Sequence, residues 1–189
     1  MQAIAQRRND IYNFFHASVS CQSYFFAPDR EDDYAAYYTA MFLLQDTSES
    51  LMHHRQKEFP TDSPLQAYLE FWGVLQAVFI QQDAIIELRQ VVFEHHPSTA
   101  HLTAWTELRE FRNVCAGHPV RKDRPKPNIV RSFMGRGFGG YQSVKYERWE
   151  RDGTRSYPRV PFGQMIDDYS VEAAEELAKV LTEMKRRWP

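Results

Sequence analysis

The sequence predicts an all-α fold, an antiparallel bundle of about five helices with a small β-hairpin insertion before the last helix. Apolar residues recur at three- and four-residue steps over the first two-thirds of the chain and again near its end. Proline and glycine fall between these segments, and the connections between the long segments are short, which favours antiparallel neighbours. A length of 189 residues suits one domain, residues 1–189.

Four helices are expected before the insertion. The first runs from about Ala3 to Phe26 and the second from Asp29 to Glu58. The third has the clearest start, because Ser63 is a good N-cap, Pro64 suits a first turn and Gln66 stands where a capping-box partner belongs. It stops before Pro97. The fourth runs from near Ser98 to Gly117, and its inward stripe is His101, Trp105, Leu108, Arg112 and Cys115.

The pattern changes after Pro119. Short strands are expected over 128–134, 141–150 and 154–159, with a hairpin turn at Arg151-Asp152-Gly153-Thr154. Ser170 then caps a last helix whose stripe is Ala174, Leu177, Leu181, Met184 and Trp188.

The insertion, residues 119–163, is basic although the chain is not. It holds eleven Lys and Arg against four Asp and Glu, a net charge of +7, while the remainder has a net charge of −9. A basic surface on an acidic body suits a phosphate-bearing partner on one face. A solvated hairpin that merely carries several arginines is the alternative.

Composition excludes several classes of protein. Hydrophobic residues make up 43% and charged residues 25%, which is typical of a soluble globular domain. The longest apolar runs are a few residues, so we expect no membrane association, and no apolar segment of a secretory signal follows the first arginines. Cys21 and Cys115 form neither a disulfide framework nor a metal-ligand spacing. We therefore expect a cytoplasmic protein without metal or cofactor.

One charged residue interrupts the apolar stripe of the fourth helix. A guanidinium at Arg112 must be paired, or must face a cleft or an interface. His118 follows six residues later, Gly117 lets the helix end between them, and Pro119 biases His118 toward an extended backbone. Arg can bind a phosphate through two parallel hydrogen bonds, and His can transfer protons near neutral pH. The pair therefore suits cleavage of RNA through its own 2′-OH, which needs an acid and a base but no metal.

This segment resembles the HEPN superfamily, whose motif is Arg, four to six residues, and then His. Five residues intervene here, and the polar residue after the Arg is Asn113. The Gly-His-Pro ending resembles a bacterial subset in which a Pro-rich turn and a hairpin follow, and the segment Gly73 to Leu88 looks like the helix that precedes the motif there. The resemblance covers roughly Leu65 to the C-terminus, since the first two helices match only in being helical.

The resemblance implies a metal-independent endoribonuclease that acts as a homodimer on RNA, in bacterial stress as a toxin with an antitoxin protein, or in phage defence. Arg112 would bind and stabilise the scissile phosphate, and Asn113 would assist. His118 would transfer a proton, with its copy across the dimer in the complementary role. Other members of the family are binding or scaffold modules, so the alternative is a non-catalytic module that binds a nucleotide, a nucleic acid or a partner protein.

Further residues are candidates for supporting roles. Gln82 and Asp83 interrupt an apolar helix, and they either orient Arg112 or lie on the polar face of that helix. A purely structural interpretation is that Arg112 neutralises an acid such as Asp83 and that His118 caps the helix C-terminus. Cys115 is a poor candidate nucleophile because it lies on the buried stripe. The expected RNA-binding residues are Arg121, Lys122, Arg124, Lys126, Arg131 and Arg136.

Overall fold

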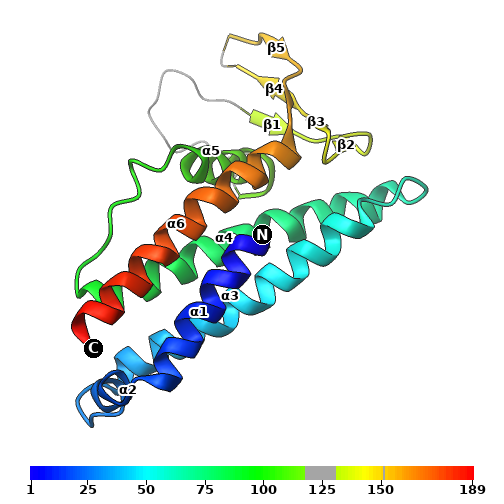
Figure 1. Cartoon of the computed structure of the whole chain (residues 1–189). Helices are drawn as coiled ribbons and strands as arrows, with labels where there is room; N and C mark the ends of the chain where they lie inside the picture. Colours follow the sequence, from blue (N-terminus) through cyan, green and yellow to red (C-terminus); the bar gives the residue numbers. More distant parts are fainter. Residues whose placement is uncertain (118–130, 151) are drawn as a thin grey trace.

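The computed structural model describes residues 1–117, 131–150 and 152–189, and it shows a mostly helical chain with small antiparallel strands before the last helix (Figure 1). These ranges contain six α-helices, one more than expected. None of the described helices is long and apolar enough to cross a membrane. The helices are α1 (Gln2–Ala17), α2 (Val19–Phe25), α3 (Glu31–Lys57), α4 (Pro64–Phe93), α5 (Thr103–Arg112) and α6 (Phe162–Arg187).

The extra helix arises because the first expected helix is broken at Ser18. This residue has an extended backbone (φ −96°, ψ 108°), and its hydroxyl accepts a hydrogen bond from the backbone N–H of Cys21 at 3.2 Å. A serine side chain that bonds the backbone two or three residues on competes with continued helix and favours a new N-terminus. The expectation of one helix from Ala3 to Phe26 was therefore wrong.

Helix α4 begins where the sequence predicts, with Ser63 as the N-cap and Pro64 as the first helical residue. The predicted capping box is wrong, because the Ser63 side chain makes no capping hydrogen bond and the Gln66 side chain donates to Glu70 at 2.8 Å instead. The helix ends at Phe93, before Pro97 as expected, and Glu94 adopts a left-handed conformation (φ 58°).

Helix α5 starts at Thr103 and not near Ser98. The Ser98 hydroxyl accepts a hydrogen bond from the backbone N–H of Ala100 at 3.4 Å, which belongs to a turn. His101 therefore precedes the helix and is exposed, although Trp105, Leu108 and Cys115 of the predicted stripe are buried. After α5 the chain continues directly into a single π-helical segment, η1 (Asn113–Gly117).

Helix α6 begins at Phe162, eight residues before the expected cap. Ser170 lies buried inside the helix, where its hydroxyl accepts a hydrogen bond from the Met1 amino group at 2.5 Å. The fully buried Phe162 anchors the start of the helix directly after Pro161. The predicted stripe of α6 is buried except for the half-buried Leu181.

The insertion is more elaborate than the single hairpin that we expected. It forms two three-stranded antiparallel sheets, in the orders β1-β4-β5 and β2-β3-β6. Gly153 (φ 87°) lies in the predicted turn between β4 and β5, and Gly139 (φ 99°) leaves no space for a side chain beside the Ser143 carbonyl. The strands are β1 (Arg131–Phe133), β2 (Gly139–Gly140), β3 (Ser143–Lys145), β4 (Glu147–Trp149), β5 (Arg155–Ser156) and β6 (Arg159–Val160).

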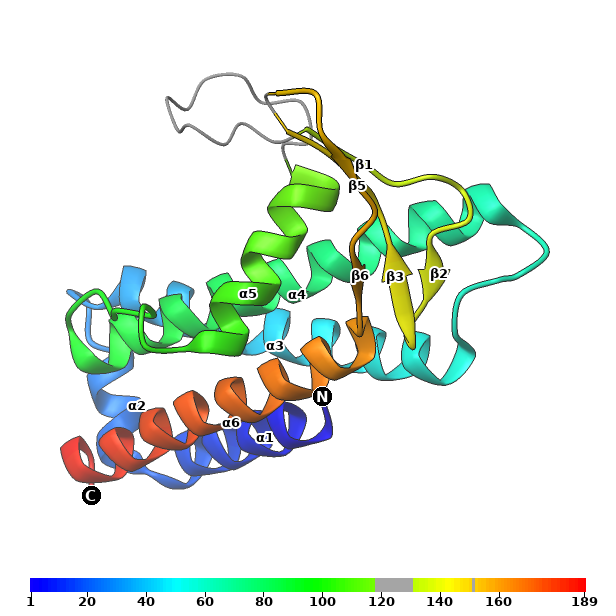
Figure 2. The same ribbon diagram turned by 90° about the horizontal axis from the view of Figure 1, so that it is seen from above.

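The helices pack through one hydrophobic core. Helix α3 lies along α4, α1 packs against α3 and α6, and α5 packs against α6. The strands lie near the start of α4 and the beginning of α6 (Figure 2). Two aromatic contacts attach them there, since the buried Phe138 lies 5.0 Å from Phe71 of α4 and the Tyr141 ring stacks on Phe162 of α6 at 5.6 Å. The insertion is thus fixed to the helical core on the side where α5 ends.

Candidate active site

Arg112 is the last residue of α5, and neutral groups hold its guanidinium in place. The guanidinium lies over the ring of Phe79 at 4.3 Å, donates to the Asn113 side-chain oxygen at 3.2 Å and donates to the Gln76 side-chain oxygen at 3.0 Å. No carboxylate among the described residues lies within 4.0 Å of it. Gln76 and Asn113 are exposed and Arg112 is half-buried, so the positive charge is fixed in position but stays reachable from solvent.

Arg109, one turn earlier on α5, provides a contrast on the same aromatic ring. Its guanidinium lies 4.1 Å from the Phe79 ring, but it also forms an ion pair with Asp83 at 3.0 Å. The charge of Arg109 is therefore balanced by a neighbour, whereas the partners of Arg112 in the described part of the chain carry no charge. Of these two arginines, Arg112 is the one suited to bind an added anion.

The crossing of α4 and α5 explains why Asp83 meets Arg109 and not Arg112. The two helices run in opposite directions here, so the earlier residue of α5 meets the later residue of α4. The predicted contact of Asp83 and Gln82 with Arg112 is wrong. Gln82 does not lie on a polar face either, because it is fully buried, donates to the backbone oxygen of Trp105 at 3.0 Å and accepts from Arg109 at 3.4 Å. The interpretation that Arg112 neutralises Asp83 is also wrong.

A glutamate of α6 fixes the start of α5. The Glu172 carboxylate accepts hydrogen bonds from the backbone N–H groups of Ala104 at 3.1 Å and Trp105 at 2.8 Å. The first N–H groups of a helix lack partners within the helix, and a carboxylate there also interacts favourably with the helix dipole. Glu172 and Gln82 together set the position of α5 and hence of Arg112.

The π-helical segment η1 follows Arg112 without a break. Such segments are rare and are found frequently at functional sites, because the widened turn redirects the residues that follow it. His118 comes next in the sequence and lies outside the described residues, as do Arg121, Lys122, Arg124 and Lys126.

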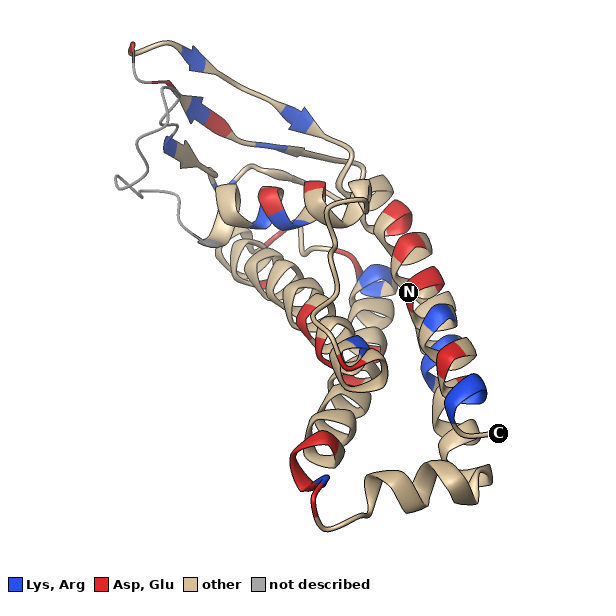
Figure 3. Ribbon diagram, turned by 90° about the vertical axis from the view of Figure 1, so that its left-hand side faces the viewer, with Lys and Arg blue, Asp and Glu red and all other residues tan. Residues whose placement is uncertain are grey.

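The remaining basic candidates lie on the insertion. Arg131 begins β1 and is exposed, and Arg136 is exposed in the connection between β1 and β2. Figure 3 shows Lys and Arg on the strands of the insertion and Asp and Glu on several of the helices, in keeping with the charge division in the sequence. Arg131 lines a cavity beside η1, whereas Arg136 is not among the residues that line it.

That cavity has a volume of about 320 Å³ and lies between α4, η1 and the strands β1 and β4. No sequence pattern indicates this cavity, because its walls come from segments that are far apart in the chain. Burial raises the pKa of the Cys115 thiol in its wall to about 12, so this cysteine stays protonated and is a poor nucleophile at neutral pH. The cavity is lined by Tyr68, Trp72, Cys115, Ala116, Arg131, Ser132, Phe133, Met134 and Trp149.

No family model, curated protein or solved structure matches this chain. Any function must therefore be argued from the residues and their geometry. In the described part of the chain, no group of three His, Cys, Asp or Glu side chains is arranged to hold a metal ion.

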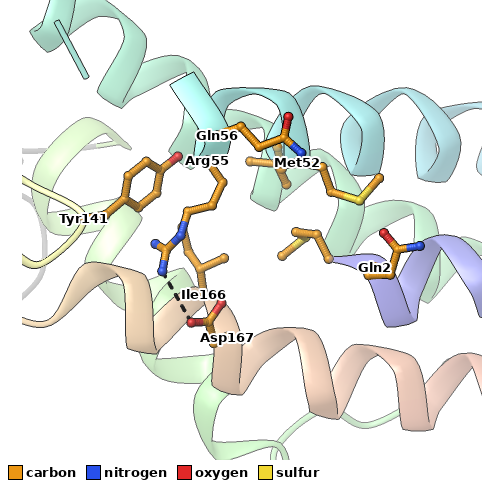
Figure 4. Close-up of a pocket in the computed structure, with 9 residues that line it drawn as sticks. Gln2, Met52, Arg55, Gln56, Tyr141, Ile166 and Asp167 are labelled. Carbon is orange, nitrogen blue, oxygen red and sulfur yellow. Dashed lines mark hydrogen bonds and ion pairs between the residues drawn. The ribbon is translucent and has the colours of Figure 1, made fainter. Parts of the chain in front are cut away.

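A second cavity, of about 250 Å³, lies between the start of α1, the end of α3 and the start of α6 (Figure 4). The guanidinium of Arg55 lies in it between the ring of Tyr141, at 4.4 Å, and the carboxylate of Asp167, at 3.4 Å. Because Asp167 balances this charge, the cavity is less suited to an anion than the surface at Arg112.

Proposed function

We propose that this protein is a metal-independent endoribonuclease of the HEPN type, an antiparallel helical bundle in which Arg112 binds the phosphate that is cleaved. One observation carries the proposal. The Arg112 guanidinium is oriented by Asn113, Gln76 and Phe79 without a carboxylate partner among the described residues. An arginine with a structural role inside a helix pair normally meets an acid, as Arg109 does here. A guanidinium that neutral groups hold in place, with no carboxylate within 4.0 Å among residues 1–117, 131–150 and 152–189, is suited to a phosphate.

The proposed reaction uses the 2′-OH of the substrate as the nucleophile. The 2′-oxygen attacks the neighbouring phosphorus and loses its proton to a base, while the 5′-oxygen leaves and receives a proton from an acid. The products are a 2′,3′-cyclic phosphate and a 5′-hydroxyl. Arg112 stabilises the negative charge that develops on the phosphoryl oxygens, and Asn113 positions Arg112 through its side-chain oxygen. His118 takes one of the two proton-transfer roles.

The second proton-transfer role calls for a second copy of the chain. Leu65 and Leu69 of α4 are 60% and 67% exposed, and their spacing places them on the face of α4 that continues to Gln76. A second copy packed against this apolar surface would bring its own Arg112 and His118 toward the same substrate. We propose a cytoplasmic homodimer that acts in bacterial stress or phage defence, with an antitoxin protein as a partner in the first case.

Cleavage in EDTA tests this function directly. Purified protein is incubated with a labelled RNA pool, and the ends of the fragments are analysed. We expect cyclic phosphate ends from the wild type and none from His118→Ala. Arg112→Ala should lower the rate about 10²- to 10³-fold, the usual effect of removing one group that stabilises transition-state charge.

Arg109→Ala is the matched control, because it removes a second guanidinium from the same ring. We expect this variant to keep its rate within a few-fold. Arg112→Lys keeps the charge but loses the planar pair of donors, and should recover only part of the rate. Wild-type protein that binds RNA but cleaves none of the pool would favour the non-catalytic binding module. Equal losses of cleavage rate in Arg109→Ala and Arg112→Ala would show that Arg112 has no special role.

A further inference from the structure

Four of the nine residues that line the cavity between α4, η1 and the strands are aromatic. Tyr68 and Trp72 come from α4, and Phe133 and Trp149 come from β1 and β4. Arg131 adds a positive charge to the same wall. A site with several flat rings and one cation is typical of pockets that stack an unpaired nucleobase and contact its phosphate.

Core packing does not account for two of these rings. Phe133 is 60% exposed and Trp72 is 41% exposed, although side chains of this size are usually covered in a folded domain. Both nevertheless line a defined cavity. An occupant of the cavity would cover part of this exposed apolar surface, and each square ångström of apolar surface removed from water is favourable.

Two of the rings are already held in place. The Trp149 indole N–H donates to the Glu147 carboxylate at 2.7 Å, and the Arg155 guanidinium lies 3.7 Å from the Trp149 ring. Tyr68 lies 4.6 Å from Trp72, ring to ring. A wall that is ordered before binding loses little conformational entropy when a ligand enters.

The cavity is adjacent to the Arg112 site on two elements. Cys115 and Ala116 line it, and both belong to the π-helical segment that follows Arg112 directly. On α4, Trp72 precedes Gln76 by four residues, or about 6 Å along the helix axis. A nucleotide next to the phosphate bound at Arg112 would therefore reach the cavity.

We propose that this cavity binds one unpaired base of the RNA strand, next to the phosphate held by Arg112, and that Arg131 contacts a neighbouring phosphate. This inference rests on the proposed function and names single-stranded RNA as its substrate. The charge of the insertion favours RNA over an apolar peptide, because β4, which forms one side of the cavity, carries Arg148, and the neighbouring strands β5 and β6 carry Arg155 and Arg159. Stacking accepts any base, so the cavity selects for unpaired strands more than for sequence.

The test measures binding separately from cleavage. The probe is a short fluorescent RNA with 2′-O-methyl groups, which lacks the nucleophile and is not cleaved. Phe133→Ala should weaken its binding roughly 5- to 150-fold, the range for loss of one base–aromatic stack. Phe133→Tyr should bind like the wild type, and Phe133→Leu should bind as weakly as Phe133→Ala, since leucine is apolar but has no ring. Because Phe133 is exposed, these variants should keep the wild-type fold, and circular dichroism checks that they do.

A matched control separates this cavity from the rest of the insertion. Tyr157 is 54% exposed and lines a second cavity of the insertion, which Phe133 also lines. Tyr157→Ala should leave binding unchanged if the base lies in the cavity beside η1, and should weaken it if the base lies in the second cavity. A series of probes is then used, each with one abasic site at a different position. One of these probes should bind the wild type and Phe133→Ala equally well, because it lacks the base that would stack on Phe133. That position locates the base in the cavity.

Failure of this inference differs from failure of the proposed function. Binding that is equal in wild type and Phe133→Ala, while Arg112→Ala still abolishes cleavage, would overturn the cavity assignment alone. Loss of binding in Phe133→Ala from a wild type that cleaves no RNA would keep the base site and overturn the nuclease. Full binding by Phe133→Leu would show an apolar docking surface and not a base-stacking site. Equal losses in Phe133→Leu and Tyr157→Ala would place the RNA in the second cavity, which both residues line, and would also overturn the inference.

Discussion

Glu172 reaches from α6 to the beginning of α5, and removing its carboxylate should destabilise the helix that carries Arg112. The residue before α5 is Leu102, whose side chain makes no capping hydrogen bond. Glu172 supplies what that position lacks, because its two oxygens accept from the N–H groups of Ala104 and Trp105 at 3.1 and 2.8 Å. The α5 N-terminus is therefore capped by a residue that lies 68 positions away in the sequence.

The cost of Glu172→Ala can be worked out from these two bonds. Loss of a capping side chain typically costs 0.5–2 kcal/mol, and loss of a favourable charge at a helix N-terminus costs about 0.3–1 kcal/mol. Because the Glu172 carboxylate is half-buried and makes both bonds, we expect a loss near the upper end, about 2 kcal/mol of unfolding free energy. In a chain of this size that lowers the melting temperature by about 4–8 °C.

Urea denaturation followed by circular dichroism measures this loss. Glu172→Gln keeps one acceptor oxygen but no charge, and should lose about half as much as Glu172→Ala. Glu175→Ala removes an exposed glutamate one turn away on α6 and should change stability by less than about 0.5 kcal/mol. If Glu172→Ala and Glu175→Ala have the same free energy of unfolding, and its slope against urea concentration is unchanged, the Glu172 carboxylate does not cap α5.

Three further predictions concern burial, assembly and pH. Glu176→Ala should lower the free energy of unfolding, measured by urea denaturation, by about 3–5 kcal/mol. The reason is that Arg89, only 12% exposed, loses the carboxylate that lies 2.5 Å away. A loss below about 1 kcal/mol would contradict a structural role for this ion pair. Leu69→Asp should convert the proposed dimer to monomer in analytical ultracentrifugation and abolish cleavage, with little change in unfolding, and a dimer that persists would exclude this face. The hydrogen bond from Gln66, and to a smaller extent those from Lys57 and His54, lowers the pKa of the Glu70 carboxyl below its ordinary 4.5. The ionised Glu70 therefore contributes its full stabilisation above pH 4.5, and this contribution is lost as the pH falls through the lowered pKa. Glu70→Gln should therefore flatten the acid side of the stability profile, and an unchanged profile would show that Glu70 does not contribute.

The long helices could be predicted because each carries its own signals. Apolar periodicity locates α3, α4 and α6, and Ser63 with Pro64 marks the start of α4 within one residue. The errors lie where distant residues decide the local structure. Helix α5 starts at Thr103 because Glu172 caps it there, and Ser170 is not a cap because Phe162 packs into the core eight residues earlier.

Only part of the candidate site could be predicted, because local sequence signals identify single residues but not their partners from distant segments. Arg112 is recognisable from the sequence, since a charged residue on an apolar stripe requires an explanation. Its partners are not, because Gln76 and Phe79 approach it only through the crossing of two helices. The cavity was missed entirely, since its aromatic residues lie on α4, β1 and β4 and no spacing along the chain connects them.

The pair of arginines on Phe79 shows how tertiary structure can give two similar residues different roles. Both guanidinium groups lie within 4.3 Å of one ring, and two uncompensated positive charges so close together would repel each other. Asp83 reduces that repulsion by pairing with Arg109, and the groups that hold Arg112 among the described residues are the ring and the neutral oxygens of Gln76 and Asn113. Arg109 and Arg112 lie three residues apart on one helix and contact the same ring, but of the two only Arg109 pairs with a carboxylate among the described residues. This difference is the basis for proposing Arg112, and not Arg109, as the phosphate ligand.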